Sequence, residues 1–187
     1  MSKVIEIRVH GRGGQGAVTA AELIAVSAFK DGKFSQAFPK FGPERRGSPL
    51  ESFCRISDEF INLRTEIYTP DHVIVLDDSL PKVVDITEGL SRKGVILINS
   101  DRKVSFNHYK VYTVNATKIA LEILGRPIVN TVMLGAFAKA TNLITLKSLI
   151  DSIKERFKGD IRKKNIKAVK RAYEEAVGWV KIQARVE

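Results

Sequence analysis

The chain has 187 residues, one cysteine, and 31 basic against 21 acidic side chains, so its formal net charge is +10. This length suits one α/β domain, and the single cysteine, Cys54, excludes an intrachain disulfide, a thiolate-ligated iron–sulfur cluster and a cysteine-rich zinc site. No apolar run approaches the roughly 20 residues of a membrane helix and no signal-peptide pattern is present, so we expect a cytoplasmic protein that does not bind membranes.

The N-terminal part of the chain predicts a strand, a glycine loop and a helix in direct succession. Apolar and polar residues alternate over residues 4–10, which is the period of a half-buried strand. After the glycines, residues 17–29 are rich in Ala, Leu, Ile and Val and predict a buried helix. A short strand, a loop rich in proline and glycine, and a further strand are predicted next, at residues 34–38, 39–49 and 51–57.

Two continuous apolar runs, at residues 73–76 and 95–98, are typical of strands covered on both faces in a parallel sheet. We expect a crossover helix between them, at residues 81–90. A strand is predicted at residues 110–114, and helical patterns follow at residues 115–124, 131–140, 146–157 and 166–180. The sequence therefore predicts one α/β domain over residues 1–187. Its open, mostly parallel sheet is flanked by helices, has a Rossmann-like start, and is closed by a C-terminal helical region at about 145–180.

The loop between the first strand and the first helix is the first candidate binding site. Gly11, Gly13 and Gly16 satisfy the pattern G-x-G-x-x-G. Glycines at this spacing permit a tight turn and direct free N–H groups at a helix N-terminus toward an anion. The remaining candidate residues of this loop are Arg12, Gly14 and Gln15. A tightly packed turn that binds no ligand remains the alternative.

The identity of the anion is constrained by what the loop contains and lacks. A dinucleotide site normally has an acidic residue about 20 residues after the glycines to bind a ribose hydroxyl. This chain has Ser35, Gln36 and Ala37 there, while the guanidinium of Arg12 favours a phosphate or carboxylate partner. The sequence therefore favours an anion other than NAD.

A second candidate site is the proline-stiffened loop that carries Glu44, Arg45 and Arg46. Two adjacent arginines on a rigid loop suit the binding of an anion. The alternative is an exposed loop whose arginines are solvated or pair with Glu44 and Glu51.

Other polar residues supply weaker signals. The three histidines lack metal-ligand spacing, so we assign no metal site and no catalytic residue to this chain. Asp77 and Asp78 follow a predicted strand, where they could bind a ligand or cap a helix. Cys54 is interpreted as a buried small hydrophobe, and Asn130 as the cap of a core helix.

The C-terminal helices are rich in Lys and Arg, but acidic residues are interspersed and no aromatic platform accompanies them. A solvated face or a contact to a partner subunit explains this pattern better than nucleic-acid binding.

The joint order of several motifs resembles the gamma subunit of 2-oxoacid:ferredoxin oxidoreductases, with pyruvate synthase as the nearest type. These motifs are residues 10–17, HGRGGQGA; residues 36–39, QAFP; residues 41–47, FGPERRG; and residues 133–136, MLGA. The resemblance extends to about residue 180.

The resemblance implies one subunit of an enzyme that converts a 2-oxoacid, coenzyme A and oxidised ferredoxin into acyl-CoA, CO2 and reduced ferredoxin, or the reverse. It implies partner alpha, beta and delta subunits that carry thiamine diphosphate, Mg and [4Fe-4S] clusters, while this chain binds no cofactor tightly. It also implies that the gamma subunit contributes to coenzyme A binding and to assembly. The rival functions are a free-standing nucleotide-dependent oxidoreductase and, last, a basic nucleic-acid-binding protein.

Overall fold

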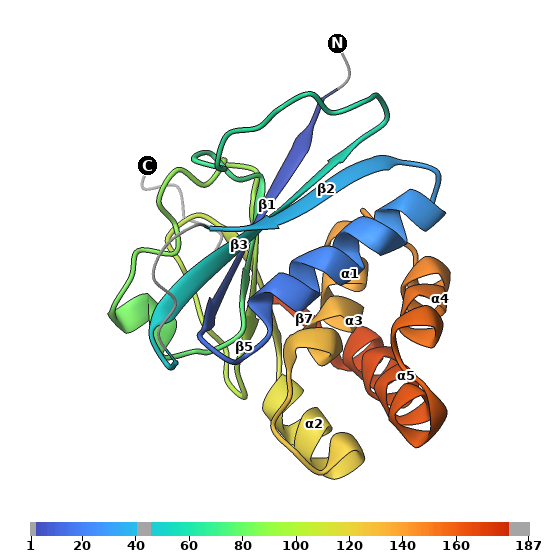
Figure 1. Ribbon diagram of the computed structural model, residues 1–187. Coiled ribbons are helices and arrows are strands. Elements are labelled where there is room, and N and C mark those ends of the chain that lie inside the picture. The colour runs from blue at the N-terminus through green and yellow to red at the C-terminus, as the bar shows by residue number, and fades with distance from the viewer. Residues whose placement is uncertain (1–2, 41–45, 180–187) are drawn as a thin grey trace.

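A seven-stranded sheet runs through the molecule in the order β2-β3-β1-β4-β5-β6-β7 (Figure 1). The computed structural model describes residues 3–40 and 46–179. The strands are β1 (Ile5–Arg12), β2 (Phe34–Pro39), β3 (Pro49–Ser57), β4 (His72–Val75), β5 (Val95–Asn99), β6 (Lys110–Val114) and β7 (Val177–Trp179). Strands β1, β4, β5 and β6 pair in parallel, and β2 runs in the same direction, whereas β3 and β7 run antiparallel to their neighbours. The predicted open, mostly parallel α/β sheet is confirmed.

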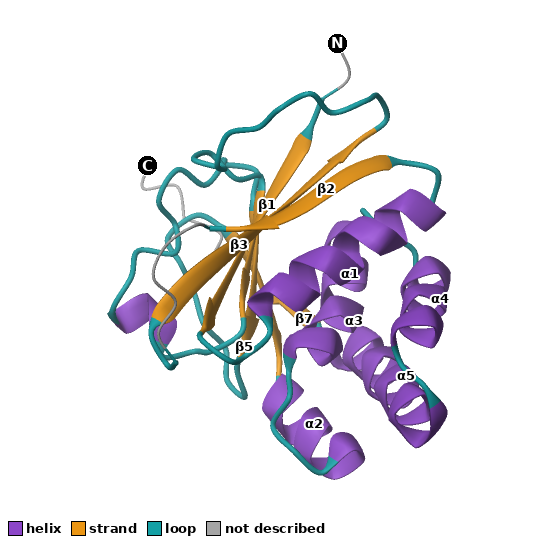
Figure 2. Ribbon diagram, in the orientation of Figure 1, coloured by secondary structure: helices purple, strands orange, loops and turns teal. Residues whose placement is uncertain are grey.

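The five helices gather on one face of this sheet (Figure 2). They are α1 (Ala17–Lys30), α2 (Ala116–Leu124), α3 (Asn130–Thr141), α4 (Leu146–Arg156) and α5 (Gly159–Glu175). Because side chains alternate along a strand, Ile7, Val9 and Ile74 point into the core on the helical face. Helix α3 is buried along most of its length, and a Cβ on Gly135 would collide with the Val169 carbonyl of α5. None of the helices in the described part is long and apolar enough to cross a membrane.

The opposite face of the sheet is covered by irregular segments rather than by a second layer of helices. Val73, Val75 and Ile98 pack there against Ile86 and Leu90 of the segment that joins β4 to β5. The crossover helix predicted at residues 81–90 is therefore wrong, since this segment contains only a short 3-10 helix, η1 (Leu80–Lys82).

Hydrogen bonding explains why this segment is not helical. The carbonyls of Ile86 and Glu88 accept hydrogen bonds from the Arg8 Nη2 group, at 3.2 and 2.7 Å. Asp85 accepts hydrogen bonds from the backbone N–H and the hydroxyl of Thr87, which forms a local turn. These bonds replace the carbonyl-to-amide bonds that a helix would require.

The prediction that β1 is half-buried is also wrong. Arg8 and His10, on the face expected to contact solvent, are only 4% and 2% exposed. Alternation still separates apolar from polar residues along β1, but the polar side faces a covered hydrogen-bonded layer instead of water.

The C-terminal helical region ends earlier than the spacing predicted. Helix α5 ends at Glu175, and β7 then pairs antiparallel to β6 at the edge of the sheet. The Lys139 ammonium donates to the carbonyls of Glu174 and Ala176 at the end of the helix, both at 2.9 Å. Gly178 has no side chain, so the strand can lie against the ring of Tyr112.

Candidate functional site

The glycine loop lies at the carboxyl end of β1 and leads directly into α1. Gly16 is the N-cap of α1 and adopts a left-handed conformation, with φ 77°. A Cβ there would collide with the side-chain amide nitrogen of Asn130, which donates a hydrogen bond to the Gly16 carbonyl at 3.3 Å. Glycine is required at this position for both reasons.

The first turn of α1 has the features on which the predicted anion site depends. Gly16 offers no side-chain cap and the first turn contains no acidic residue. The N–H groups at the start of a helix have no partner within the helix, and its dipole favours negative charge there. The described part of the loop can therefore hold a phosphate or carboxylate at the start of α1.

The Arg12 guanidinium binds groups of its own chain, whereas the sequence favoured a phosphate or carboxylate ligand as its partner. Its Nε group donates to Asp77 Oδ2 at 3.1 Å, Nη2 donates to the Ser79 hydroxyl at 2.8 Å, and Nη1 donates to the Gly47 carbonyl at 3.1 Å. The Arg12 side chain is 28% exposed. Arg12 thus joins the ends of β1 and β4 to the second candidate loop.

Asp77 is the common acceptor of this network. The side-chain amide of Gln15 donates to Asp77 Oδ2 at 3.0 Å, while the Gln15 oxygen accepts from the Arg12 backbone N–H at 2.8 Å. Partial burial by itself raises the pKa of Asp77, but the hydrogen bonds from Ser79 and Gln15 and the attraction of Arg12 outweigh it and lower the pKa. The carboxylate is therefore ionised at neutral pH and organises the loop.

The two candidate loops, separated by about 30 residues of sequence, lie side by side. Gly13 forms an isolated parallel bridge with Arg46. The Gly13 N–H donates to the Ser48 carbonyl at 2.9 Å, and the Gly47 N–H donates to the Gly13 carbonyl at 3.1 Å. Arg46 is exposed beside the glycine loop, whereas Glu44 and Arg45 lie outside the described residues. The structure brings the described parts of both predicted sites into one place.

Two buried polar side chains, Arg8 and His10, lie on β1 directly before the glycine loop. Arg8 Nε donates to His10 Nε2 at 3.0 Å, so that nitrogen is an acceptor and the imidazole is neutral. Burial, followed by the repulsion of Arg8, lowers the pKa of His10 to about 4. The contact of 3.7 Å between His10 Nδ1 and Glu51 is therefore not an ion pair at neutral pH.

Protein side chains occupy the place where an open α/β sheet usually binds a dinucleotide. Open α/β sheets bind ligands where the strand order reverses, which here is between the carboxyl ends of β1 and β4. The side chains of Arg12 and Asp77 meet at that point. In β2, Ser35 and Gln36 bind carbonyls of their own chain, and β3 separates β2 from β1. These features oppose a free-standing NAD-dependent enzyme.

Two residues of this site carried weaker or different signals in the sequence. Asp77 was one of two acids that follow an apolar run, and no spacing rule connected it with Arg12. The sequence predicts Asn130 as a helix cap, but the N-cap of α3 is Val129, and the Asn130 side chain contacts the glycine loop. Cys54 is fully buried as predicted, and burial raises the pKa of its thiol.

The model of the pyruvate ferredoxin/flavodoxin oxidoreductase family matches residues 6–175. The chain belongs to this family. A pyruvate synthase subunit PorC from Methanothermobacter marburgensis is 58% identical over 171 residues, which cover 91% of this chain and 97% of that protein. The common gamma subunit of the pyruvate/ketoisovalerate oxidoreductases of Thermococcus litoralis is 50% identical over 93% of this chain and 98% of its own length.

A solved structure has the same fold as this chain. The crystal structure of the pyruvate oxidoreductase subunit PORC from Thermotoga maritima has a TM-score of 0.84 and 38% identity, and it covers 94% of this chain and 98% of that one. These relatives are subunits of 2-oxoacid oxidoreductases, so the predicted kinship with gamma subunits is confirmed. Among the described residues, no group of three or more His, Cys, Asp or Glu side chains is placed to hold a metal ion.

Proposed function

We propose that this chain is the subunit that contributes to coenzyme A binding in a 2-oxoacid:ferredoxin oxidoreductase complex. The observation that supports this most is the uncapped start of α1, where free N–H groups meet a glycine loop that is bridged to Arg46. Coenzyme A carries a diphosphate and a ribose phosphate, and these groups match an amide cradle with an exposed guanidinium beside it.

Some residues of the candidate site are proposed to contact the phosphates of coenzyme A, and others to hold the glycine loop in shape. The contacts to phosphate come from the backbone of Gly14 and Gly16 and from the side chains of the second loop, Arg45 and Arg46. Gly11, buried in β1, and Gly13, whose N–H group already binds Ser48, shape the loop. Arg12 and Gln15 hold the loop in shape through Asp77, so their contribution is positioning. Glu44 is proposed to orient the two arginines.

The covalent and redox chemistry is proposed to take place on the other subunits. Thiamine diphosphate with Mg supplies the carbanion chemistry of oxoacid decarboxylation, and [4Fe-4S] clusters carry the electrons to ferredoxin. This chain has one cysteine, which is fully buried, so it does not supply four thiolates to a cluster. We therefore propose alpha, beta and delta partner subunits as the carriers, and we assign no catalytic residue here.

The test is a double substitution, Arg45→Ala with Arg46→Ala, in the assembled complex. The KM for coenzyme A is expected to rise roughly tenfold or more, because a charge-assisted hydrogen bond contributes about 1.5–3 kcal/mol. Decarboxylation of the 2-oxoacid in the absence of coenzyme A should be unchanged.

A matched control is Arg92→Ala, which removes another exposed arginine far along the chain from both loops. An unchanged KM in the double variant would overturn the coenzyme A role. A failure to assemble with the other subunits, with normal KM in the fraction that does assemble, would identify the loop as an interface element instead.

A further inference from the structure

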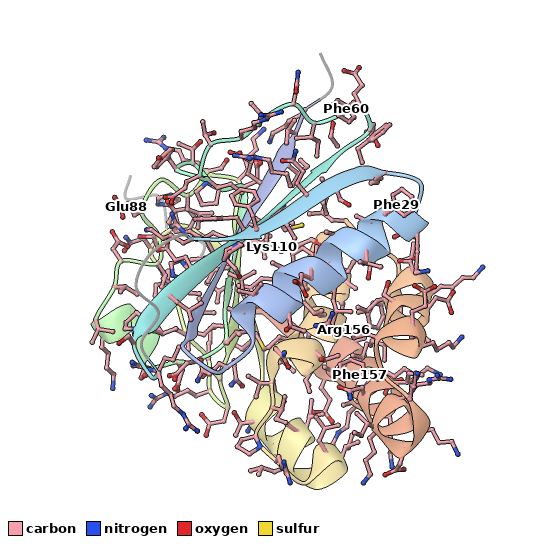
Figure 3. All side chains as sticks on the ribbon, viewed as in Figure 1. Phe29, Phe60, Glu88, Lys110, Arg156 and Phe157 are labelled. Carbon is pink, nitrogen blue, oxygen red and sulfur yellow. The ribbon has the colours of Figure 1, made fainter. Side chains whose placement is uncertain are left out.

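A cavity lies among the helices. Its volume is about 560 Å3, which is within the usual range for ligand-binding pockets. It is formed by the first turn of α1, the connection from α2 to α3, the end of α4 and the start of α5. Arg156 and Phe157, at the end of α4, mark its position in Figure 3.

Four apolar side chains line this cavity, beside polar ones such as Thr131 and Asn165, and two of the four are exposed to water. Leu124 and Phe157 line it together with Ile128 and Ile161, which are 49% and 60% exposed. Because these two isoleucines adjoin a cavity, a partner that enters the cavity could remove both from water at once.

The rim adds positive charge to this apolar surface. Arg126, Arg156 and Lys164 line the cavity together with a single acid, Asp160. Lys164 pairs with Asp160 at 2.8 Å, and Arg156 reaches Glu22 at 3.4 Å. With these two pairs formed, Arg126 gives the rim an excess of one positive charge, which favours a partner that combines apolar side chains with a carboxylate.

We infer that this cavity receives an acidic, apolar segment of another subunit of the same oxidoreductase complex. The relatives of this chain are named as subunits, so surfaces of this chain are expected to be covered by other chains. A small anion confined to the cavity would leave Ile128 and Ile161 partly in water, whereas a polypeptide covers the cavity and its mouth together. This inference does not depend on the coenzyme A proposal.

The cavity also touches the candidate site through one residue. Asn130 lines the cavity, is 8% exposed, and donates to the Gly16 carbonyl of the glycine loop. Thr19, in the first turn of α1, lines the same cavity. A segment that fills the cavity therefore packs against the residue that holds the start of α1 in place.

The experiment is a competition for incorporation into the complex. Wild-type and variant copies of this chain carry different tags and are co-produced with the other subunits, and the complex is purified through a tag on one of those subunits. The ratio of the two copies in the complex, divided by their ratio in the extract, measures relative affinity and corrects for variants that fold less well.

Two substitutions address the two properties of the cavity. Ile161→Asp is expected to reduce incorporation about tenfold, because it places a carboxylate on the apolar mouth. Ile161 lies in the first turn of α5, where an aspartate favours the helix, so the variant should fold. Arg126→Glu is expected to reduce incorporation about fivefold at low salt and less at high salt.

Matched controls are Val83→Asp and Arg92→Glu, which alter an exposed aliphatic and an exposed arginine in the segment on the opposite face. Normal incorporation of both cavity variants would overturn the inference. It would also be overturned if the variants assembled normally but raised the KM for coenzyme A, because the cavity would then hold a small ligand. A normal KM with reduced incorporation supports it whether or not the arginine loop binds coenzyme A.

Discussion

Arg12 and Asp77 form an ion pair across the carboxyl ends of two neighbouring parallel strands, with 3.1 Å between Nε and Oδ2. The pair lies at the place where an open α/β sheet usually binds its ligand. It also connects the glycine loop to the segment after β4 and, through the Gly47 carbonyl, to the second candidate loop. The site is thus organised by contacts within the chain, and the start of α1 is the surface to which we assign anion binding.

Replacement of Asp77 by asparagine should loosen the glycine loop while keeping the size of the side chain. The change removes the charge that accepts hydrogen bonds from Arg12 and Gln15, so the free energy of unfolding should fall by about 1–3 kcal/mol. Urea unfolding measures this loss, and amide exchange at Gly13 should accelerate. The exposed neighbour provides the control: Asp78→Asn should change stability by less than about 0.5 kcal/mol. Equal effects of the two substitutions would contradict the role given to Asp77.

Replacement of Gly16 by alanine should destabilise the protein by roughly 2–4 kcal/mol. Alanine would have to adopt the left-handed backbone of this position, which costs about 1 kcal/mol or more, and its Cβ would collide with the Asn130 side chain. A second substitution, Asn130→Ala, removes the collision and should recover part of the loss. A double-mutant cycle measured by thermal or urea unfolding would show this as favourable coupling, and strict additivity would refute the contact.

The stability of the chain should depend on pH through His10. Its pKa is about 4 in the folded protein and 6.5 in the unfolded chain, so the unfolded chain binds the proton first as pH falls. The contribution of neutral His10 is complete above about pH 6.5 and is progressively lost between pH 6.5 and 4, by about 3 kcal/mol in total.

The His10→Gln variant tests this pH dependence. It keeps a side-chain acceptor for Arg8 and should flatten the fall in stability between pH 7 and 5. The pKa of His72 is also lowered by burial, so some dependence should remain. His108→Gln, at an exposed position, should leave the profile unchanged. A profile for His10→Gln identical to that of the wild type would show that His10 is not the group responsible.

Local patterns predicted the strands and helices wherever neighbouring residues decide the structure. The alternation in residues 4–10, the apolar runs of β4 and β5 and the helix that follows Asn115 are confirmed. The prediction failed at residues 81–90, where a helix would have used the carbonyls that bind Arg8, a residue almost 80 positions earlier. It failed again after Glu175, because the edge of β6 was available for pairing.

The sequence predicted the candidate site as two loops, and by itself it determined the resemblance to the family and the glycine spacing before the first helix. Only the tertiary structure decided that Gly13 lies beside Arg46, that Arg12 is paired with Asp77, and that Asn130 occupies the space left by the missing side chain of Gly16. These partners are 33, 65 and 114 positions apart in the chain. Their contacts follow from the parallel pairing of β1 with β4, the insertion of β3 beside β1, and the packing of α3 against α1, and none of these arrangements is encoded by local periodicity.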